Sequence, residues 1–475
     1  MVCTNVKKNS RGRTWLTKGK TDGLNRWYVY QRYRSLSVQR ESPQALIVVT
    51  RSIFILLMFL LWKITAAPGD DLGSSSQVLD SHWSKNEPFG HNIPRDLKTD
   101  GLEDVRDALA MAGITVERGR TDVIIPQKDI GADRGFVGSL VKFPNGDIQV
   151  KAGKTQLRSS DAGRTWRPVE SQFQLYPCRT DDGVTLQFTG RTTDGRPPHK
   201  LYPSEKTGLV QRSAEFIRSP DSGLTATAES ATIFMPMQCK MLVINHGRIV
   251  ELPDGSLLSN GYATFEEDPI VTYDTWVMKI GRIHAKKFQK NRVVVIHSDD
   301  GGRTWHYRAT VAFDASRHTR KRILGFAEPD MVALSSGDLL CFMRTVAGGG
   351  VRPLHMSTSH DGGMTWSHAD PVADRGVSPC VIEMNSGLIV LGYGRPMNWL
   401  AFSTDGGQTW LGHFQFYMGA KGWDSWNQLA LEEVAPDTLL VTYARLDPTA
   451  KIGTKERRRG DLMGTYFTVK WENRQ

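Results

Sequence analysis

One short pattern, S-x-D-x-G-x-T-W, recurs along this chain and limits what it can fold into. It occurs four times in the 475 residues, at Ser159–Trp166, Ser298–Trp305, Ser359–Trp366 and Ser403–Trp410. A fifth copy, Ser219–Ala226, keeps every fixed position except the Trp. Repetition of this kind is typical of folds built from several copies of one small structural unit. The eight-residue pattern is called the box below.

The residue types of the box suit the turn of a β-hairpin. An Asp carboxylate can accept hydrogen bonds from backbone N–H groups of its own turn, and Gly adopts a positive φ without steric cost. Thr then begins the next strand, and Trp offers a large apolar surface to a neighbouring unit. The aspartates are therefore predicted to lock turns rather than to act as catalytic acids; they are Asp161, Asp300, Asp361 and Asp405.

A second element, a turn followed by an apolar strand, precedes each box. These turns lie near Gly146, Gly183, Gly255, Gly337, Gly387 and Asp437. Turn-and-strand and box alternate five times, and a sixth unit has the strand but no box. Six units between about residue 130 and residue 475 have somewhat more than fifty residues each, which suits blades of four antiparallel strands around an axis. The predicted fold class is all-β, a six-bladed β-propeller with box hairpins.

The N-terminal region is predicted to be separate from the propeller. Residues 1–51 contain eleven Lys/Arg and two Asp/Glu, and the apolar run Ile53–Trp62 and small residues before Pro68 follow. Ten apolar residues are short for a bilayer, so residues 1–67 are predicted to be a basic leader plus signal peptide. The protein is then secreted or periplasmic without stable membrane insertion, and a signal anchor is the alternative. Residues 68–125 are predicted to be a linker and short N-terminal segment, and residues 126–475 the propeller.

Four further segments complete the predicted organisation. Gly101–Gly113 is predicted to be a helix that stops at its last glycine. Val123–Pro126 is predicted to be a strand that closes the ring from the N-terminal side, and Met463–Trp471 to be the closing strand of the sixth unit. Gly261–Arg292 is an insertion in the third unit, expected to overhang one face of the ring.

Charge and cysteine content exclude several classes of function. The formal net charge of +10 lies in residues 1–63, and residues 64–475 sum to zero, so no nucleic-acid partner is expected. Four of the five cysteines lie beyond the leader, where export permits disulfides, although a free buried thiol is equally natural for Cys341. No CxxC or His-x-x-x-His pattern indicates a metal, and no cofactor is predicted. The oligomeric state does not follow from the sequence.

The boxes resemble those of the sialidase-like superfamily, also called the BNR or Asp-box family, over most of the chain from about residue 130. The segment AEPDMVALSSGDLLCFMRT, followed by a box, resembles the central sialidase segment, and GLIVLGYGRPMNWLAFSTDGGQTW resembles the next blade. The resemblance implies that Glu328 lines the site and that Arg344 and Arg395 hold a substrate carboxylate. The expected partner is a glycan.

The residues themselves also favour a paired arginine site. Arg344 and Arg395 each end an apolar strand at equivalent points of adjacent units. Equivalent strand ends of a propeller converge near its axis, and two forked guanidinium groups suit a carboxylate or a sulfate. The alternative is that each arginine forms a structural salt bridge at a blade edge, for example with Glu328.

The chain departs from the sialidase pattern where a Tyr nucleophile is expected. The corresponding stretch offers Trp423 and Trp426, which can stack on a sugar but cannot act as nucleophiles. The sialidase acid/base aspartate has no match either. The predicted catalytic residues are Glu328, Asp268 and Tyr443, and the further predicted substrate-binding residues are Arg445, His246 and Arg248.

These observations predict a secreted sialidase-like glycoside hydrolase acting on an acidic, carboxylated or sulfated, glycan. One alternative is a carbohydrate-binding propeller without catalytic activity. The other is a polysaccharide lyase on the same fold, in which a base removes a proton next to a carboxylate that arginines neutralise.

Overall fold

The structure is a computed structural model, and its described residues fall in twelve ranges. These are residues 7–8, 14–15, 100–130, 139–173, 178–244, 248–277, 282–316, 323–347, 352–394, 397–417, 429–446 and 460–472. The chain divides into two units, Met1–Ser74 and Ser75–Gln475. In the first unit, β1 (Lys7–Lys8) pairs with β2 (Thr14–Trp15), and the predicted signal peptide lies outside the described residues. No helix within the twelve ranges is long and apolar enough to cross a membrane.

The second unit is a ring of six blades, and each blade contains a four-stranded antiparallel path. The first blade is β4 (Ser139–Lys142), β5 (Ile148–Ala152), β6 (Thr155–Ser159) and β7 (Arg167–Pro168). The second is β8 (Cys178–Arg179), β9 (Thr185–Phe188), β11 (Val210–Ser219) and β12 (Thr227–Met235), with β10 (Tyr202–Pro203) on β11. The third is β14 (Ile249–Glu251), β15 (Leu257–Phe265), β18 (Arg292–Ser298) and β19 (Thr304–Ala312), with β13 (Cys239–Val243) on β15.

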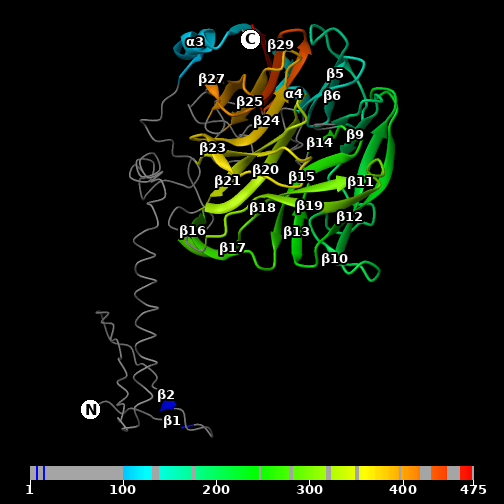
Figure 1. Cartoon of the computed structure of the whole chain (residues 1–475), viewed down its shortest axis with the longest axis vertical. Helices are drawn as coiled ribbons and strands as arrows, with labels where there is room; N and C mark the ends of the chain where they lie inside the picture. Colours follow the sequence, from blue (N-terminus) through cyan, green and yellow to red (C-terminus); the bar gives the residue numbers. More distant parts are fainter. Residues whose placement is uncertain are drawn as a thin grey trace, which may run out of the picture. The chain divides into compact units, whose positions relative to one another are not determined.

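The other three blades follow the same plan. The fourth is β20 (Ile323–Ala333), β21 (Leu339–Ala347), β22 (Leu354–Ser359) and β23 (Asp370–Ala373), and the fifth is β24 (Val377–Glu383), β25 (Ile389–Gly394), β26 (Asn398–Ser403) and β27 (Leu411–Tyr417). The sixth is β28 (Ala430–Ala435), β29 (Thr438–Leu446), β30 (Gly460–Trp471) and β3 (Ile114–Ile125). Figure 1 shows the blades following one another around the ring in sequence order, from cyan-green through yellow to red. The predicted six-bladed β-propeller is confirmed.

The predicted box turns are confirmed atom by atom. In the box at Ser359–Trp366, the Ser359 hydroxyl donates to Asp361 Oδ1 over 2.8 Å, and the N–H of Thr365 donates to the same oxygen over 2.9 Å. The Thr365 hydroxyl donates to Asp361 Oδ2 over 2.5 Å. The other boxes make the same bonds, and so does the degenerate copy at Ser219–Ala226. Each box joins the third and fourth strands of its blade, and its Asp is a turn lock.

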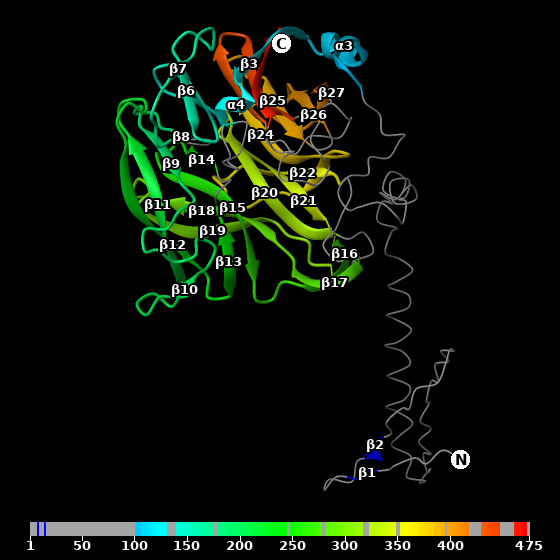
Figure 2. The same cartoon turned by 180° about the vertical axis from the view of Figure 1, so that it is seen from behind.

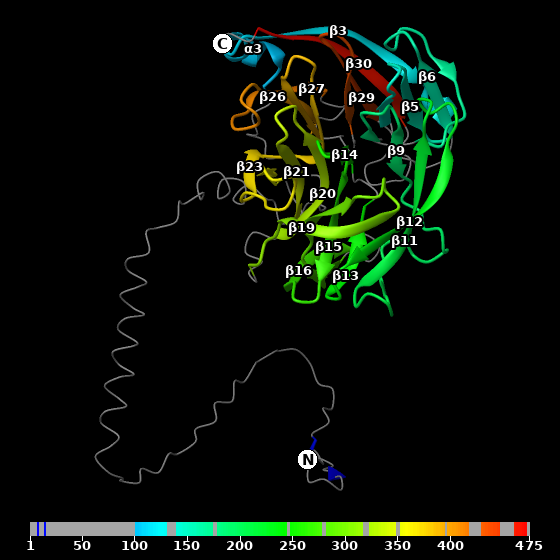
Figure 3. The same ribbon diagram turned by 45° about the vertical axis from the view of Figure 1, so that its right-hand side comes forward.

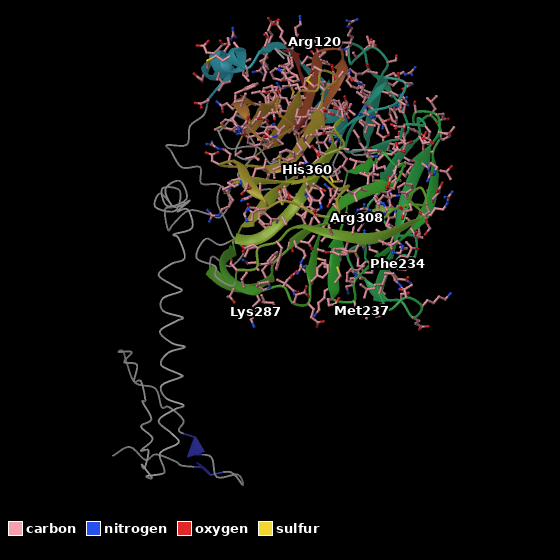
Figure 4. All side chains as sticks on the ribbon, viewed as in Figure 1. Arg120, Phe234, Met237, Lys287, Arg308 and His360 are labelled. Carbon is pink, nitrogen blue, oxygen red and sulfur yellow. The ribbon has the colours of Figure 1, made fainter. Side chains whose placement is uncertain are left out.

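The boxes also fix the spacing between blades, because each box glycine packs against a side chain of the preceding blade. A Cβ on Gly223 would lie 2.3 Å from Phe143, and one on Gly302 would lie 2.7 Å from Phe216. Gly163, Gly363 and Gly407 stand similarly close to Tyr466, Leu258 and Leu340. Arg120, labelled in Figure 4, stabilises the contact between Gly163 and Tyr466. Its guanidinium carbon lies 4.1 Å from the centroid of the Tyr466 ring, and Nη2 donates to the Gly163 carbonyl over 2.8 Å.

The hydrophobic core is divided into six clusters, and each cluster fills the space between two consecutive blades. Two segments far apart in the sequence close the ring. The strand β3, which comes before the first blade in the sequence, pairs with β30 as the outer strand of the sixth blade, as Figure 3 shows. The helix α3 (Leu102–Met111), predicted as Gly101–Gly113, packs on β27 through the buried Leu109 (Figure 2). The short helix α4 (Gln127–Ile130) follows β3.

The closing strands are longer than predicted. Val123–Pro126 was expected to hold the N-terminal strand, yet β3 begins at Ile114, so the ring starts before the expected boundary at residue 126. The strand expected at Met463–Trp471 begins at Gly460. The insertion expected at Gly261–Arg292 is shorter, because residues 261–265 belong to β15 and Arg292 begins β18. Between them lies a separate hairpin of β16 (Ile270–Val277) and β17 (Arg282–Gln289). Disulfides are absent among the described residues, whose four cysteines are free and buried thiols: Cys178, Cys239, Cys341 and Cys380.

Candidate active site

Two neighbouring inner strands, β20 of the fourth blade and β24 of the fifth, share an unusual turn of the backbone. Glu328 on β20 has φ 48° and Ser378 on β24 has φ 49°, and each stands directly before a proline. The pairing register shifts at both places, between Ala327 and Asp330 and between Val377 and Cys380. Bulges of this kind re-aim side chains, and a left-handed conformation in a residue other than glycine marks strain that often lies at functional sites.

The bulge brings Glu328 to an arginine and a hydroxyl from two different strands. Arg344 on β21 donates from Nη1 to Glu328 Oε1 over 2.9 Å, and the Ser378 hydroxyl lies 3.4 Å from Glu328 Oε2. The side chains of Arg344 and Glu328 are 24% and 26% exposed. The salt bridge considered as the alternative role of Arg344 is therefore present, but its two partners remain open to solvent.

Tyr262 of the third blade lies near enough to Glu328 and Arg344 for their charges to act on its phenol. Burial raises the pKa of its phenol, the charge of Glu328 raises it further, and the charge of Arg344 lowers it. Tyr262 was not predicted, although its position in the sequence carries a signal. It follows the turn at Gly255 by seven residues, as Arg344 follows the turn at Gly337. Equivalent positions in adjacent blades thus hold a phenol and a guanidinium.

A second ion pair lies two residues along β20 from Glu328. Arg248 donates from Nε to Asp330 Oδ1 over 2.9 Å and from Nη2 to Asp330 Oδ2 over 3.1 Å. Asp330 Oδ2 also accepts the N–H of Val381 on β24 over 2.8 Å. Burial alone would lower the pKa of Arg248, but the Asp330 carboxylate raises it above its usual value. Arg248, predicted to bind substrate, is held within the inner strands by Asp330.

The other predicted catalytic residues are engaged in internal contacts. Asp268 is 3% exposed, accepts the N–H of Phe265 over 2.6 Å and receives both Nε and Nη2 of Arg292. Tyr443 is 1% exposed, its hydroxyl lies 3.0 Å from that of Thr465, and burial raises its pKa. These contacts tie both side chains into the interior of their blades, where a structural role accounts for them.

The remaining predicted residues divide into one that is described and four that are not. Arg445 donates from Nε to Asp461 within the sixth blade over 3.1 Å. Arg395, Trp423, Trp426 and His246 lie outside the described residues, so the paired arginine site stays a prediction. Within the part of the chain that the structure describes, no group of three or more His, Cys, Asp or Glu could hold a metal ion.

The described group therefore offers a carboxylate, a guanidinium, a hydroxyl and a phenol on adjacent blades. A guanidinium can donate to an acidic group of a ligand while it keeps one bond to a carboxylate, because it carries five N–H donors. A carboxylate can accept a proton, and a phenol with a raised pKa stays protonated at neutral pH and can donate a hydrogen bond. Together these groups can donate hydrogen bonds to an anionic group and accept them from a hydroxyl.

Comparison with known proteins supports the repeat architecture. A family model described as a BNR repeat-like domain matches residues 200–423, which hold four of the five boxes. No curated protein matches the sequence. A structure of a protein of unknown function from Dyadobacter fermentans is 18% identical, with a TM-score of 0.49, and the match covers 75% of this chain and 99% of that one.

Two other similar structures are named as enzymes. The α-L-arabinanase of Penicillium chrysogenum is 12% identical with a TM-score of 0.47, covering 74% of this chain and 98% of that chain. The intramolecular trans-sialidase of Ruminococcus gnavus is 14% identical with a TM-score of 0.45, covering 73% and 97%. Likenesses of this degree carry no argument about activity. The repeats and the blades establish that this chain is a six-bladed β-propeller, and its residues 200–423 match the BNR repeat-like domain.

Proposed function

We propose that this protein is a glycoside hydrolase that acts on an acidic glycan, carboxylated or sulfated, at the site around Glu328 and Arg344. The observation that carries the proposal is the strained bulge of Glu328, which points a partly exposed carboxylate at Arg344 and Ser378. A strained residue persists only where its surroundings hold it. A structural ion pair at a blade edge would not require such a backbone.

Three residues of the group, Glu328, Tyr262 and Arg344, have a role in this proposal. Glycoside hydrolysis needs one group to protonate the leaving oxygen and another to activate water or attack the sugar. Glu328, as the carboxylate of an ion pair, suits the second role. Tyr262 can assist the first role only by donating a hydrogen bond to the leaving oxygen, because its raised pKa makes the phenol a weaker acid. Arg344 would hold the acidic group of the sugar, with Arg395 as its proposed partner from the next blade.

A carbohydrate-binding propeller without catalysis is the second candidate, and one observation favours it. Asp268 and Tyr443, the other two predicted catalytic residues, are buried in internal contacts. Glu328 is then the one predicted catalytic group of the described chain that is open to solvent, and a single carboxylate bound to an arginine is sufficient for recognition alone.

The test is an assay of the purified protein on sialosides, uronides and sulfated glycans, with product analysis. New reducing ends indicate hydrolysis, an unsaturated product absorbing in the ultraviolet indicates a lyase, and binding without product indicates the recognition module. The Glu328→Gln variant should lose turnover by roughly 100- to 10,000-fold, since this is the typical contribution of a general acid or base. Unchanged turnover would remove Glu328 from the mechanism.

Arg344→Ala should weaken glycan binding by about tenfold or more, because a hydrogen bond to a charged group contributes about 1.5–3 kcal/mol. Arg106→Ala is the matched control, because Arg106 is an exposed arginine on α3 that pairs with Glu103. Calorimetry of both variants with the same glycan gives the comparison. Equal affinities in the two variants would contradict a binding role for Arg344.

A further inference from the structure

We propose that Asp330 is a positioning residue: by joining three blades behind the two bulges, it holds Glu328 and Ser378 in the arrangement that the site requires. The inference deepens the proposed function and rests on it for its kinetic readout, while its structural readout is independent of any activity. It also gives Arg248 a positioning role, as the residue that orients Asp330, in place of the predicted role in substrate binding.

The two bulges are copies of one motif in adjacent blades. Glu328-Pro329-Asp330 on β20 matches Ser378-Pro379-Cys380 on β24, and the first residue of each has φ near +49°. A residue before proline is driven toward extended backbone, so a left-handed conformation there is costly and must be imposed by neighbouring contacts. The contact between the Ser378 hydroxyl and Glu328 depends on both bulges keeping this shape.

Asp330 supplies a bond directly behind both bulges. Its carboxylate is two residues after Glu328, and it accepts the N–H of Val381, three residues after Ser378, over 2.8 Å. The bond joins β20 to β24 between the fourth and fifth blades. Because Asp330 is 2% exposed, water competes little for this bond, and it fixes the position of one bulge relative to the other.

Arg248 fixes the carboxylate itself. Its guanidinium, from the third blade, binds both oxygens of Asp330 over 2.9 and 3.1 Å, and Nη2 lies 3.6 Å from Cys380 Sγ on β24. A bidentate guanidinium–carboxylate pair sets orientation as well as distance. One buried carboxylate thus receives groups from the third and fifth blades while it belongs to the fourth, and the strained Glu328 stands two residues away.

The experiment compares Asp330→Asn with Asp147→Asn. Asp147 also forms a buried pair with an arginine, since Arg158 donates to it from Nε over 2.7 Å and reaches the Ser222 carbonyl of the next blade. It lies between the first and second blades, so it controls for the loss of a buried ion pair alone. In Asp330→Asn the amide N–H₂ would face Arg248 Nε in one orientation, and both Arg248 Nη2 and the Val381 N–H in the other.

We expect both variants to lower the melting temperature to a similar extent, and only Asp330→Asn to lower kcat, by about 100-fold, with a smaller change in KM. Its crystal structure should show residue 328 at negative φ, with the Ser378 hydroxyl beyond hydrogen-bond distance of Glu328. Retained φ at residue 328, or an equal loss of kcat in Asp147→Asn, overturns the proposal. If Asp330→Asn does not fold, Arg248→Lys takes its place, because it keeps the positive charge but cannot form the bidentate contact with Asp330. The same fall in kcat is expected of it, and the same results would overturn the proposal.

The proposed function and this inference fail in different ways. A wild-type protein without turnover on any glycan of the panel contradicts the hydrolase, and the φ of residue 328 in the Asp330→Asn crystal structure then decides the positioning role. Turnover in the wild type with an unaltered residue 328 and unaltered kcat in the variant contradicts the positioning role alone.

Discussion

At the scale of single residues, each box glycine is a position where two blades approach closely. Gly223 has φ +77° and a Cβ there would lie 2.3 Å from Phe143, whereas Gly255 has φ +78° and a Cβ there would meet nothing within 4 Å. Gly255→Ala should lower the free energy of unfolding by about 1–2 kcal/mol through left-handed strain. Gly223→Ala should lose a further 1–3 kcal/mol or so through overpacking.

Urea unfolding of the two variants measures the difference, and the shared φ makes Gly255→Ala a matched control. Equal losses would mean that the blades separate enough to admit a methyl group. The packing of box glycines on the preceding blade would then contribute little to stability.

The site shows which residue roles a sequence can indicate. Glu328 and Arg344 were predicted through the resemblance of their segment to the central sialidase segment, and Arg344 also because it ends an apolar strand; the structure joins the two in one ion pair. Asp268 was predicted because the insertion was expected to overhang the ring, and Tyr443 because it ends the strand of the sixth unit as Arg344 ends that of the fourth. Neither reason identifies their partners, Arg292 and Thr465. Tyr262 could have been found by counting from its turn.

At the scale of elements, the box turn is sensitive to acid. Hydrogen bonds from Thr365 are the main cause that lowers the pKa of Asp361 to about 2 from an ordinary value of 3.8, and the pKa of each other box aspartate is lowered as well. The folded protein therefore binds fewer protons than the unfolded chain between these values. The melting temperature should fall as the pH falls from about 4 toward 2.

Asp361→Asn tests whether the turn is responsible. The variant should melt at a lower temperature than the wild type at neutral pH and should show a weaker dependence on pH between 4 and 2, because one of the five carboxylates no longer titrates. Scanning calorimetry across that range gives both quantities. A pH dependence identical to that of the wild type would place the acid sensitivity elsewhere.

Elements with a strong local pattern were predicted well, and β3 shows why others were not. The boxes, the six turns and α3 each carry turn residues or a periodic apolar face in a short window of sequence. The middle of β3 reads Glu117, Arg118, Gly119, Arg120, and it is exposed. An edge strand with few buried side chains has no alternating pattern to recognise, and its pairing with β30 depends on chain hundreds of residues away.

At the scale of the whole molecule, closure of the ring depends on that strand. A chain that begins at Asp100 keeps α3 and β3, whereas a chain that begins at Pro126 lacks the outer strand of the sixth blade. The shorter chain also loses Leu109, Ile114 and Val116 from the cluster between the fifth and sixth blades. We expect the first chain to melt cooperatively and the second to melt at a much lower temperature and without a sharp transition.

Circular dichroism during heating distinguishes the two truncated chains. A matching, sharp transition in both would show that β30 can close the ring without β3, and that the propeller begins at residue 126 after all.

The pairing of β3 with β30 has a consequence for the newly made chain. About 335 residues separate the end of β3 from the start of β30, and at about 5–20 residues per second a ribosome needs roughly 20–70 s to add them. During that time β3 waits outside the ribosome with an unpaired edge, open to association with other nascent chains. Four charged residues of β3 oppose such association: Glu117, Arg118, Arg120 and Asp122. The residues that make β3 difficult to predict from the sequence thus protect its unpaired edge until β30 is synthesised.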